Sequence, residues 1–213
     1  MVKFYNLYVN VIHGIKMWSD TRNINTTGAK IPVENEERNM KRIEDYVTTI
    51  PNFPKEGIMF RDVTTVLSDA DGLKLAVDEL TKLLDGIDFD VLVGTESRGF
   101  IFGSAIAYNL HKPLVLARKK GKLPRKTVSA EYELEYGTDV IEMHADSIKP
   151  GQKVVLVDDL LATGGTMKAT ASLVEELGGE VVKIIFLMEL LGLKGTEKLA
   201  KYDVKSVVSY PGA

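Results

Sequence analysis

Residues 154–166 read Val-Val-Leu-Val-Asp-Asp-Leu-Leu-Ala-Thr-Gly-Gly-Thr, an order of residue types that predicts a strand, a loop and the start of a helix. The opening β-branched run predicts a buried strand, which we expect to end at two adjacent carboxylates, Asp158 and Asp159. Small residues at 162–165 leave backbone N–H groups free to converge on one anion. A helix beginning near Thr166 adds its positive end, so the segment predicts a site for a phosphate monoester.

The two aspartates indicate what carries the phosphate. Carboxylates repel a phosphate that they face, but they accept hydrogen bonds well from a diol such as the 2′ and 3′ hydroxyls of a ribose. A plain Gly-Gly turn after a solvated strand end is the simpler alternative, and it leaves the combination of features unexplained. The segment is not a Walker A loop, because no lysine follows the glycines, and its glycine spacing does not fit a dinucleotide fingerprint. A sugar phosphate is therefore the favoured ligand class.

Strand and helix patterns alternate on both sides of this segment. The spacing of apolar residues predicts helices and strands in turn: helices at 70–84, 100–110 and 166–177, and strands at 90–93, 114–117 and 181–187. This alternation predicts an α/β fold with a mainly parallel central sheet flanked by helices. Ligands of such folds bind beyond the carboxyl ends of the strands, so we expect the site in the loops after Val93, Ala117 and Val157.

Composition narrows the class of protein. Of the 213 residues, 45% are hydrophobic and 27% are charged, which is the balance of a soluble globular domain. The chain has no cysteine, which excludes disulfides, cysteine nucleophiles and thiolate metal sites. A net charge of −3 and the lack of a long apolar run argue against nucleic-acid and membrane partners. His13, His111 and His144 share no metal-ligand spacing, and we expect structural or surface roles for them.

Four motifs between about residue 40 and residue 199 resemble those of the type I phosphoribosyltransferases, in the family's order. Residues 154–166 resemble the motif that binds 5-phosphoribosyl 1-pyrophosphate (PRPP), in the wording of the adenine-specific branch. The resemblance implies the type I phosphoribosyltransferase fold and a purine salvage reaction in which adenine and PRPP give AMP and pyrophosphate, with Mg²⁺ carried in by PRPP and no dedicated protein metal site. It also implies that Asp158 and Asp159 hold the ribose hydroxyls, and that the 5′-phosphate is bound by Ala162, Thr163, Gly164, Gly165 and Thr166.

Two segments resemble the parts of the family that meet pyrophosphate. Residues 94–100 form a polar turn between glycines and contain Arg98, whose guanidinium suits a phosphate group, although an arginine near a helix start is also a common surface ion pair. Residues 118–126 carry six basic residues and no acidic one, and we expect them to be mobile until an anion binds. A solvated loop or a nucleic-acid patch is the alternative. The resemblance implies a flexible catalytic loop over about 118–137, in which pyrophosphate is met by Arg118, Lys119 and Lys122.

The two remaining motifs concern the acid and the base. Residues 134–137, Leu-Glu-Tyr-Gly, are similar to the family's loop tip, which implies a catalytic role for Glu135 with Tyr136 beside it. Arg98 of the polar turn is the third residue to which we assign a catalytic role. Such a carboxylate accepts or orients the proton that adenine loses as N9 attacks, whereas the alternative is a solvated charge. Residues 52–62 resemble the family's base-binding hood, over about 40–62. The implied adenine contacts are the ring of Phe60, the backbone of Met59 and Arg61, and the side chain of Leu160.

Residues 1–39 match nothing in the family. We expect an N-terminal extension outside the fold, a phosphoribosyltransferase domain at 40–213 and a natural start at Met40. Two other functions stay open: a xanthine- or guanine-type purine phosphoribosyltransferase, and a PRPP-sensing regulator on the same fold. The partners implied by the resemblance are adenine, PRPP, AMP, pyrophosphate and a second copy of the chain, because family members are usually homodimers. We expect a cytoplasmic location.

Overall fold

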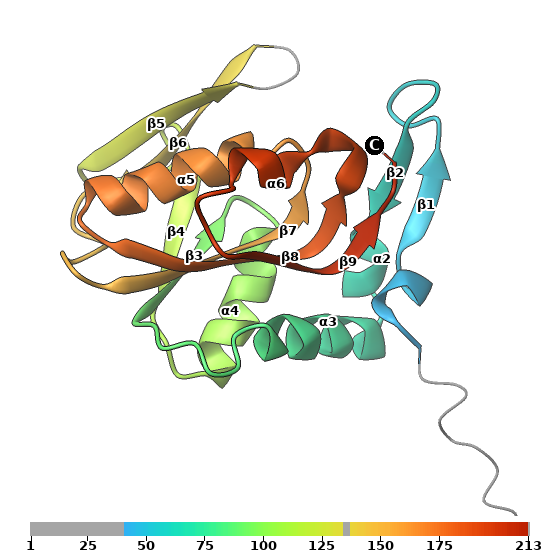
Figure 1. Cartoon of the computed structure of the whole chain (residues 1–213), viewed down its shortest axis with the longest axis horizontal. Helices are drawn as coiled ribbons and strands as arrows, with labels where there is room; N and C mark the ends of the chain where they lie inside the picture. Colours follow the sequence, from blue (N-terminus) through green and yellow to red (C-terminus); the bar gives the residue numbers. More distant parts are fainter. Residues whose placement is uncertain (1–40, 134–136, 213) are drawn as a thin grey trace, which may run out of the picture. The chain divides into compact units, whose positions relative to one another are not determined.

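The computed structural model describes residues 41–133 and 137–212. A seven-stranded sheet forms the centre of this part of the chain, in the order β5-β6-β4-β3-β7-β8-β9 (Figure 1). Strands β4, β3, β7, β8 and β9 run parallel, whereas β6 is antiparallel to both β4 and β5. The strands span Val91–Thr95 (β3), Leu114–Lys119 (β4), Thr127–Glu133 (β5), Thr138–His144 (β6), Lys153–Leu161 (β7), Glu180–Leu190 (β8) and Val204–Tyr210 (β9). The prediction of a mainly parallel sheet is confirmed.

Helices cover both faces of the sheet. Figure 1 shows α3 and α4 on one face and α5 and α6 on the other. The helices span Thr64–Leu67 (α2), Ala70–Lys82 (α3), Gly99–Asn109 (α4), Gly165–Glu176 (α5) and Gly195–Lys198 (α6), with short 3₁₀ turns at Ile43–Asp45 (η2) and Leu191–Leu193 (η3). Helix α3 begins where the Asp69 carboxylate accepts hydrogen bonds from the amides of Asp71 and Gly72. The helices predicted at 70–84, 100–110 and 166–177 are confirmed.

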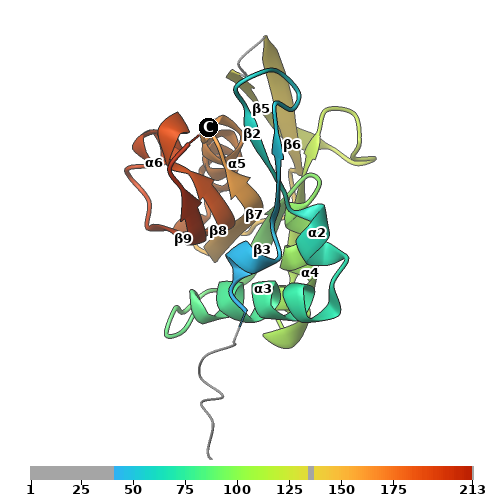
Figure 2. The same cartoon turned by 90° about the vertical axis from the view of Figure 1, so that its right-hand side faces the viewer.

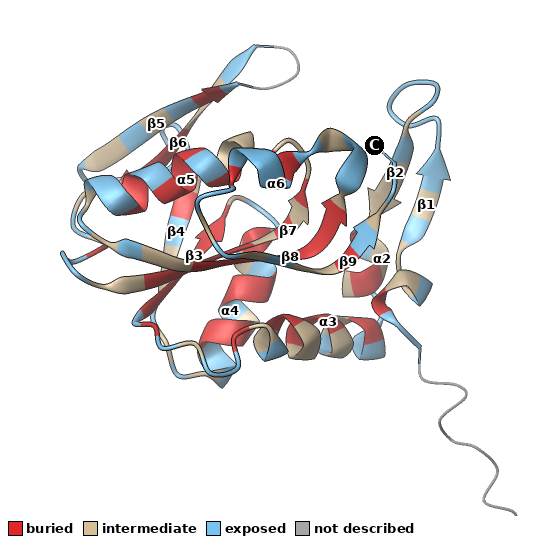
Figure 3. Ribbon diagram, in the orientation of Figure 1, coloured by how far each residue is buried: buried red, intermediate tan, exposed pale blue. Residues whose placement is uncertain are grey.

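The position of β7 in the middle of the sheet explains the apolar run at residues 154–157. Val155 and Val157 face the core that α3 and α4 cover, while Val154 and Leu156 face the core beneath α5. A strand buried on both faces needs apolar residues at every position rather than at alternate ones. Figure 3 shows the same distribution, with buried residues along the middle strands and on the helix faces that meet them.

Two features differ from the predicted strands and loops. Strand β7 does not end at the carboxylates: it runs through Asp158 and Asp159 to Leu161, because β8 continues alongside it and pairs Leu161 with Glu189. Within the segment predicted as a loop at 118–137, residues 127–133 form β5, which pairs with β6 as an antiparallel hairpin. The flexibility of that segment stays a prediction.

A separate two-stranded sheet occupies the region predicted as the hood. Strands β1 (Thr48–Pro51) and β2 (Met59–Asp62) pair antiparallel, and the rings of Phe53 and Phe60 meet edge to face with centroids 5.1 Å apart. The Arg61 guanidinium lies 4.2 Å from the ring centre of Tyr210 at the end of β9, which ties this small sheet to the large one. The β1–β2 and β5–β6 hairpins extend toward the same side of the molecule (Figure 2).

Candidate active site

A cleft of about 460 Å³ lies at the carboxyl ends of β3, β4 and β7. This is the edge at which ligands of parallel α/β sheets bind, and the volume suits a small ligand. Four separate segments contribute its lining residues: Glu96, Ser97 and Arg98; Lys119; Tyr132; and Asp158, Asp159, Leu160, Ala162 and Thr166. The structure therefore brings together three of the predicted motifs, those of the carboxylate pair, the pyrophosphate turn and the basic run.

The carboxylate pair is held from two directions. Arg98 Nε donates to Asp159 Oδ2 at 2.5 Å, and the Asp159 side chain is almost fully buried. Asp158 Oδ1 accepts the Asp159 backbone amide at 2.9 Å and lies against Gly99 at the start of α4, where a methyl group would come within 2.8 Å of it. Burial first, and the neighbouring Asp159 carboxylate second, raise the pKa of Asp158 well above its ordinary value.

A second, smaller cavity of about 80 Å³ lies at the phosphate loop and shares Asp158, Leu160, Ala162 and Thr166 with the cleft. Its floor is the stretch predicted to bind phosphate, namely Ala162, Thr163, Gly164, Gly165 and Thr166. Gly164 caps α5 with φ of +76°, a conformation that favours glycine, and, having no side chain, it forms no capping hydrogen bond with the first amides of the helix. The first amides of α5 are thus available to an anion, as the phosphate-site prediction requires.

Two of the three basic residues predicted to meet pyrophosphate, Arg118 and Lys119, form ion pairs with acidic side chains. Arg118 binds both carboxylate oxygens of Glu96 at 3.2 Å, and its Nη1 donates to the Lys122 carbonyl. Burial opposes the charge of Glu96, but the hydrogen bonds from Arg118 and the Lys119 amide outweigh it and lower the pKa of this carboxyl. Of the three basic residues predicted to meet pyrophosphate, Lys119 lines the cleft, whereas Arg118 and Lys122 are not among its lining residues.

Three residues of the cleft region were not singled out from the sequence: Glu96, Tyr132 and Asp139. Lys119 Nζ lies 2.9 Å from Asp139 Oδ2, and the Tyr132 hydroxyl donates to the same oxygen at 3.2 Å. The hydrogen bond from Lys119 lowers the pKa of Asp139, and burial raises the pKa of Tyr132. The hairpin register pairs Tyr132 with Asp139, so a correct prediction of β5 and β6 would have placed them together.

The predicted adenine contacts are distributed over two places. Leu160 lines the cleft, whereas Met59, Phe60 and Arg61 lie on β2 and are not among its lining residues. Asp62 ends β2, and hydrogen bonds from Thr64 are the main reason that its pKa is lowered, with a smaller contribution from the charge of Arg98. The predictions for Glu135 and Tyr136, and those for residues 1–40, lie outside the described residues.

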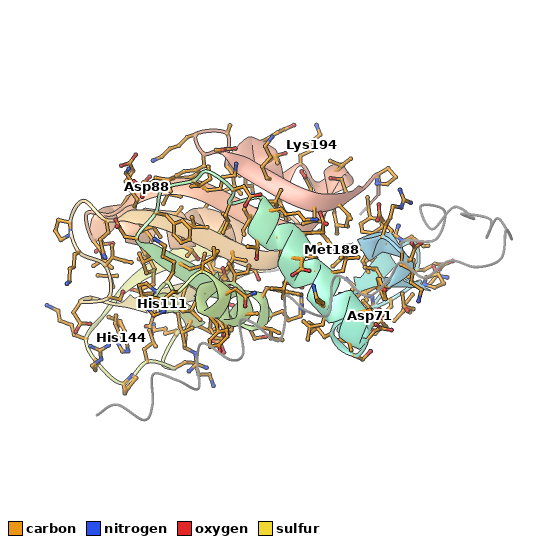
Figure 4. All side chains as sticks on the ribbon, turned by 90° about the horizontal axis from the view of Figure 1, so that it is seen from below. Asp71, Asp88, His111, His144, Met188 and Lys194 are labelled. Carbon is orange, nitrogen blue, oxygen red and sulfur yellow. The ribbon has the colours of Figure 1, made fainter. Side chains whose placement is uncertain are left out.

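His111 and His144 are not among the residues that line the cleft, and His13 lies outside the described residues. His111 follows α4, and His144 ends β6 with a buried Nδ1 atom that has no hydrogen-bond partner (Figure 4). Within residues 41–133 and 137–212, no group of three or more histidine or acidic side chains is arranged to hold a metal ion. No helix in the same residues has the length and apolar character needed to span a membrane.

Comparison with known proteins supports the prediction made from the motifs. A family model described as the phosphoribosyl transferase domain matches residues 67–210. The chain is 70% identical to adenine phosphoribosyltransferase of Agathobacter rectalis over 173 residues, which cover 81% of this chain and 99% of that one. It is 68% identical to that of Butyrivibrio fibrisolvens over 168 residues, which cover 79% of this chain and 93% of that one.

Solved structures agree. The crystal structure of adenine phosphoribosyltransferase from Thermoanaerobacter pseudethanolicus has a TM-score of 0.76 at 52% identity, covering 79% of this chain and 98% of that one. The enzyme from Trypanosoma brucei, in complex with AMP, pyrophosphate and ribose-5-phosphate, has a TM-score of 0.72 at 25% identity, covering 78% and 77%. The chain, with its carboxylate pair, phosphate loop and doubly covered parallel sheet, belongs to the type I phosphoribosyltransferase family, in the adenine phosphoribosyltransferase branch.

Proposed function

We propose that the chain transfers the 5-phosphoribosyl group of PRPP to N9 of adenine, giving AMP and pyrophosphate in purine salvage. The bond from ribose C1 to the pyrophosphate oxygen breaks, the bond from C1 to N9 forms, and N9 loses its proton. The observation that carries the proposal is the single cleft in which the carboxylate pair of β7, the phosphate loop, Arg98 and Lys119 meet. A sugar phosphate that bears a second, polyanionic group fits this combination.

The sugar phosphate is assigned to the β7 side of the cleft. The free amides at the start of α5 bind the 5′-phosphate, together with the hydroxyls of Thr163 and Thr166. The carboxylates of Asp158 and Asp159 accept hydrogen bonds from the ribose hydroxyls. Arg98 supports this role, because its ion pair fixes the Asp159 carboxylate and offsets part of the negative charge that a bound phosphate would meet.

Pyrophosphate is assigned to the β4 side. Lys119 faces the cleft, and its carboxylate partner, Asp139, belongs to the β6 strand of the hairpin. We expect pyrophosphate to replace Asp139 as the partner of Lys119 and Glu96 as the partner of Arg118, since a polyphosphate offers more charge than one carboxylate. Lys122 is expected to join them as the following turn closes. Such an exchange keeps Lys119 paired before and after binding.

Mg²⁺ is proposed to enter with PRPP. The carboxylates beside the phosphate loop are Asp158 and Asp159, and Asp159 already accepts Arg98. This donor set is too small for a dedicated site but suits an ion that is held by substrate phosphates and remains partly hydrated. When bound, the ion neutralises charge on the departing pyrophosphate.

The base and its proton complete the proposal. Adenine is assigned to the space between Leu160 and the ring of Phe60, where the backbone of Met59 and Arg61 reads its edge. Glu135, with Tyr136 beside it, receives or orients the N9 proton. Replacement Glu135→Ala is expected to lower kcat more than it raises KM, and Glu131→Ala on the same hairpin is the matched control. An effect confined to KM would contradict the assignment.

A base-specificity assay tests the function directly. The full chain is incubated with PRPP, Mg²⁺ and adenine, guanine, hypoxanthine or xanthine, and both nucleotide and pyrophosphate are measured. Rapid AMP formation from adenine alone is the expected result. Preference for an oxopurine would indicate the sibling activity, and PRPP binding without pyrophosphate release with any base would indicate a regulator.

We propose that two copies of the chain associate through the outer face of α4. This helix contains no charged residue, and its solvent side presents Ile101 and Tyr108, which are exposed by 44% and 87%. Large apolar side chains exposed on an uncharged helix, with only Ser104 and Asn109 as exposed polar residues, favour a covered surface. Light scattering of the full chain is expected to give a dimer mass, and Tyr108→Lys a monomer. A monomeric unchanged chain would refute this.

The domain boundary and the cellular location are part of the same proposal. We assign the enzyme to residues 40–213 and the extension to residues 1–39. A cytoplasmic location is compatible with the absence of cysteine, since nothing in the chain depends on an oxidising compartment. Fractionation of the source cells, with the protein detected in the cytoplasmic fraction, is the corresponding measurement.

A further inference from the structure

Gly195, the first residue of α6, lies directly behind the phosphate loop although it is distant in sequence. A methyl group added to Gly195 would come within 2.2 Å of the Ala162 carbonyl oxygen and within 2.7 Å of Leu161 Cδ1. The first of these neighbours is backbone, so no side-chain rotation relieves the clash. Any residue other than glycine at this position must therefore displace the loop, α6 or both.

The contact is mutual. A methyl group added to Gly164 would lie 2.6 Å from the Gly195 carbonyl oxygen, so the two glycines face each other across the loop. Gly164 needs glycine for a second reason, its φ of +76°. Gly195 has no such conformational requirement, since it is not among the residues with positive φ. Its need for glycine comes from the close approach alone.

The segment that carries Gly195 is firmly anchored. Leu199, directly after α6, is completely buried in the same core cluster as Leu161 and Met167, which flank the phosphate loop on either side. Figure 1 shows α6 beside the beginning of α5. Because both partners rest on one core, a displacement caused at Gly195 passes to the loop rather than being absorbed by a free end.

We infer that Gly195 is a positioning residue for the phosphate loop, acting through Ala162 and Gly164 without contacting the substrate. Backbone amides bind a phosphate well only when several of them point at it together, and a shift of a few tenths of an ångström weakens every one of these hydrogen bonds. The absent side chain of Gly195 lets the chain support the loop from behind in the required shape. This inference rests on the proposed function and extends it.

The test is Gly195→Ala in the full chain, with two matched glycine controls. Gly179→Ala is also crowded, since its methyl would lie 2.8 Å from Ile148 Cγ2, but Gly179 follows the other end of α5; Gly212→Ala has nothing within 4 Å. For Gly195→Ala we expect the KM for PRPP and the dissociation constant for AMP to rise about tenfold, the loss of roughly one charge-assisted hydrogen bond. Gly179→Ala should lower the melting temperature but leave both constants unchanged, and Gly212→Ala should change neither. Equal constants for Gly195→Ala and the unchanged chain would overturn the inference.

A second measurement needs no variant. Hydrogen exchange of residues 191–199 in the unchanged chain should slow when AMP binds, because the loop and this segment support each other. Unaltered exchange there, alongside slower exchange at 162–166, would contradict the inference even if Gly195→Ala failed to fold. Failure of the unchanged chain to bind AMP at all would instead refute the proposed function, and the inference with it.

Discussion

Replacement of Arg98 by alanine is expected to destabilise the protein as well as to impair the cleft, because it leaves Asp159 buried without a cation. The Asp159 side chain is 5% exposed and that of Arg98 is 45% exposed. With charge centres about 4 Å apart and an effective dielectric constant of about 20, their attraction is about 4 kcal/mol. Solvent around the half-exposed guanidinium screens roughly half of this, which leaves a net loss of about 2 kcal/mol.

A double-mutant cycle measures this coupling. Urea unfolding is followed for the unchanged chain, Arg98→Ala, Asp159→Asn and the double variant, and the coupling free energy is expected to be about 2 kcal/mol. The melting temperature of Arg98→Ala should fall by about 4–8 °C, because in a domain of this size each kcal/mol lowers it by about 2–4 °C. AMP binding should weaken in the same variant, since the Asp159 carboxylate is no longer fixed.

Certain results would refute the reasoning. A coupling free energy below about 0.5 kcal/mol would mean that Arg98 and Asp159 behave as an ordinary surface pair. Arg98→Lys provides a control that keeps the charge but loses the planar guanidinium, and it should recover part of the stability. If alanine and lysine variants were equally stable, the hydrogen-bond geometry rather than the charge would be the relevant contribution.

Three further outcomes are expected. Burial and the neighbouring Asp159 raise the pKa of Asp158 in the folded protein above its value of about 3.9 in the unfolded chain. The free energy of unfolding therefore decreases as the pH rises above about 3.9, because the unfolded chain loses this proton more readily. Asp158→Asn should therefore raise the melting temperature at neutral pH while weakening AMP binding in calorimetry, and a lower melting temperature would contradict this. Tyr210→Ala removes the ring beneath Arg61 and should raise the KM for adenine about threefold, while the KM for PRPP stays constant. Deletion of residues 1–39 should leave kcat and the melting temperature unchanged, and a loss of either would assign the extension to the enzyme.

The parallel core and the phosphate loop could be predicted because their signals are local. Strand β7 is apolar at every position from Val154 to Val157, and the glycines that follow the strand mark the change from strand to helix. The prediction that β7 ends at the aspartates is wrong because the length of this strand depends on a distant segment. Strand β8 pairs with β7 as far as Leu161, and the residues around the aspartates do not reveal that pairing. A strand takes its length from its neighbour as much as from its own residues.

The β5–β6 hairpin and the support of the phosphate loop by Gly195 were harder to predict, because both depend on contacts between residues that are distant in the sequence. Strands β5 and β6 follow the basic run at 118–126 and carry acidic residues among their apolar ones, so neither shows the continuous apolar pattern of a buried strand. Tyr132 and Asp139 come together only through the register of this hairpin, which the sequence does not show. The ion pairs of Arg98 and Arg118 join residues far apart in the sequence. The role of Gly195 likewise depends on its contact with the distant residue Ala162, and a single glycine in the sequence does not predict such a contact.

The pairing of β3 with β7 determines when the active site forms during folding. Residues 91–94 pair with residues 154–157, so two walls of the cleft meet only after a crossover that includes α4, β4 and the hairpin has been completed. Such long-range parallel pairing forms late and slowly. During refolding from denaturant, catalytic turnover should therefore reappear after helical circular dichroism has recovered, and polypeptides released early from synthesis, before β7, should be inert rather than weakly active.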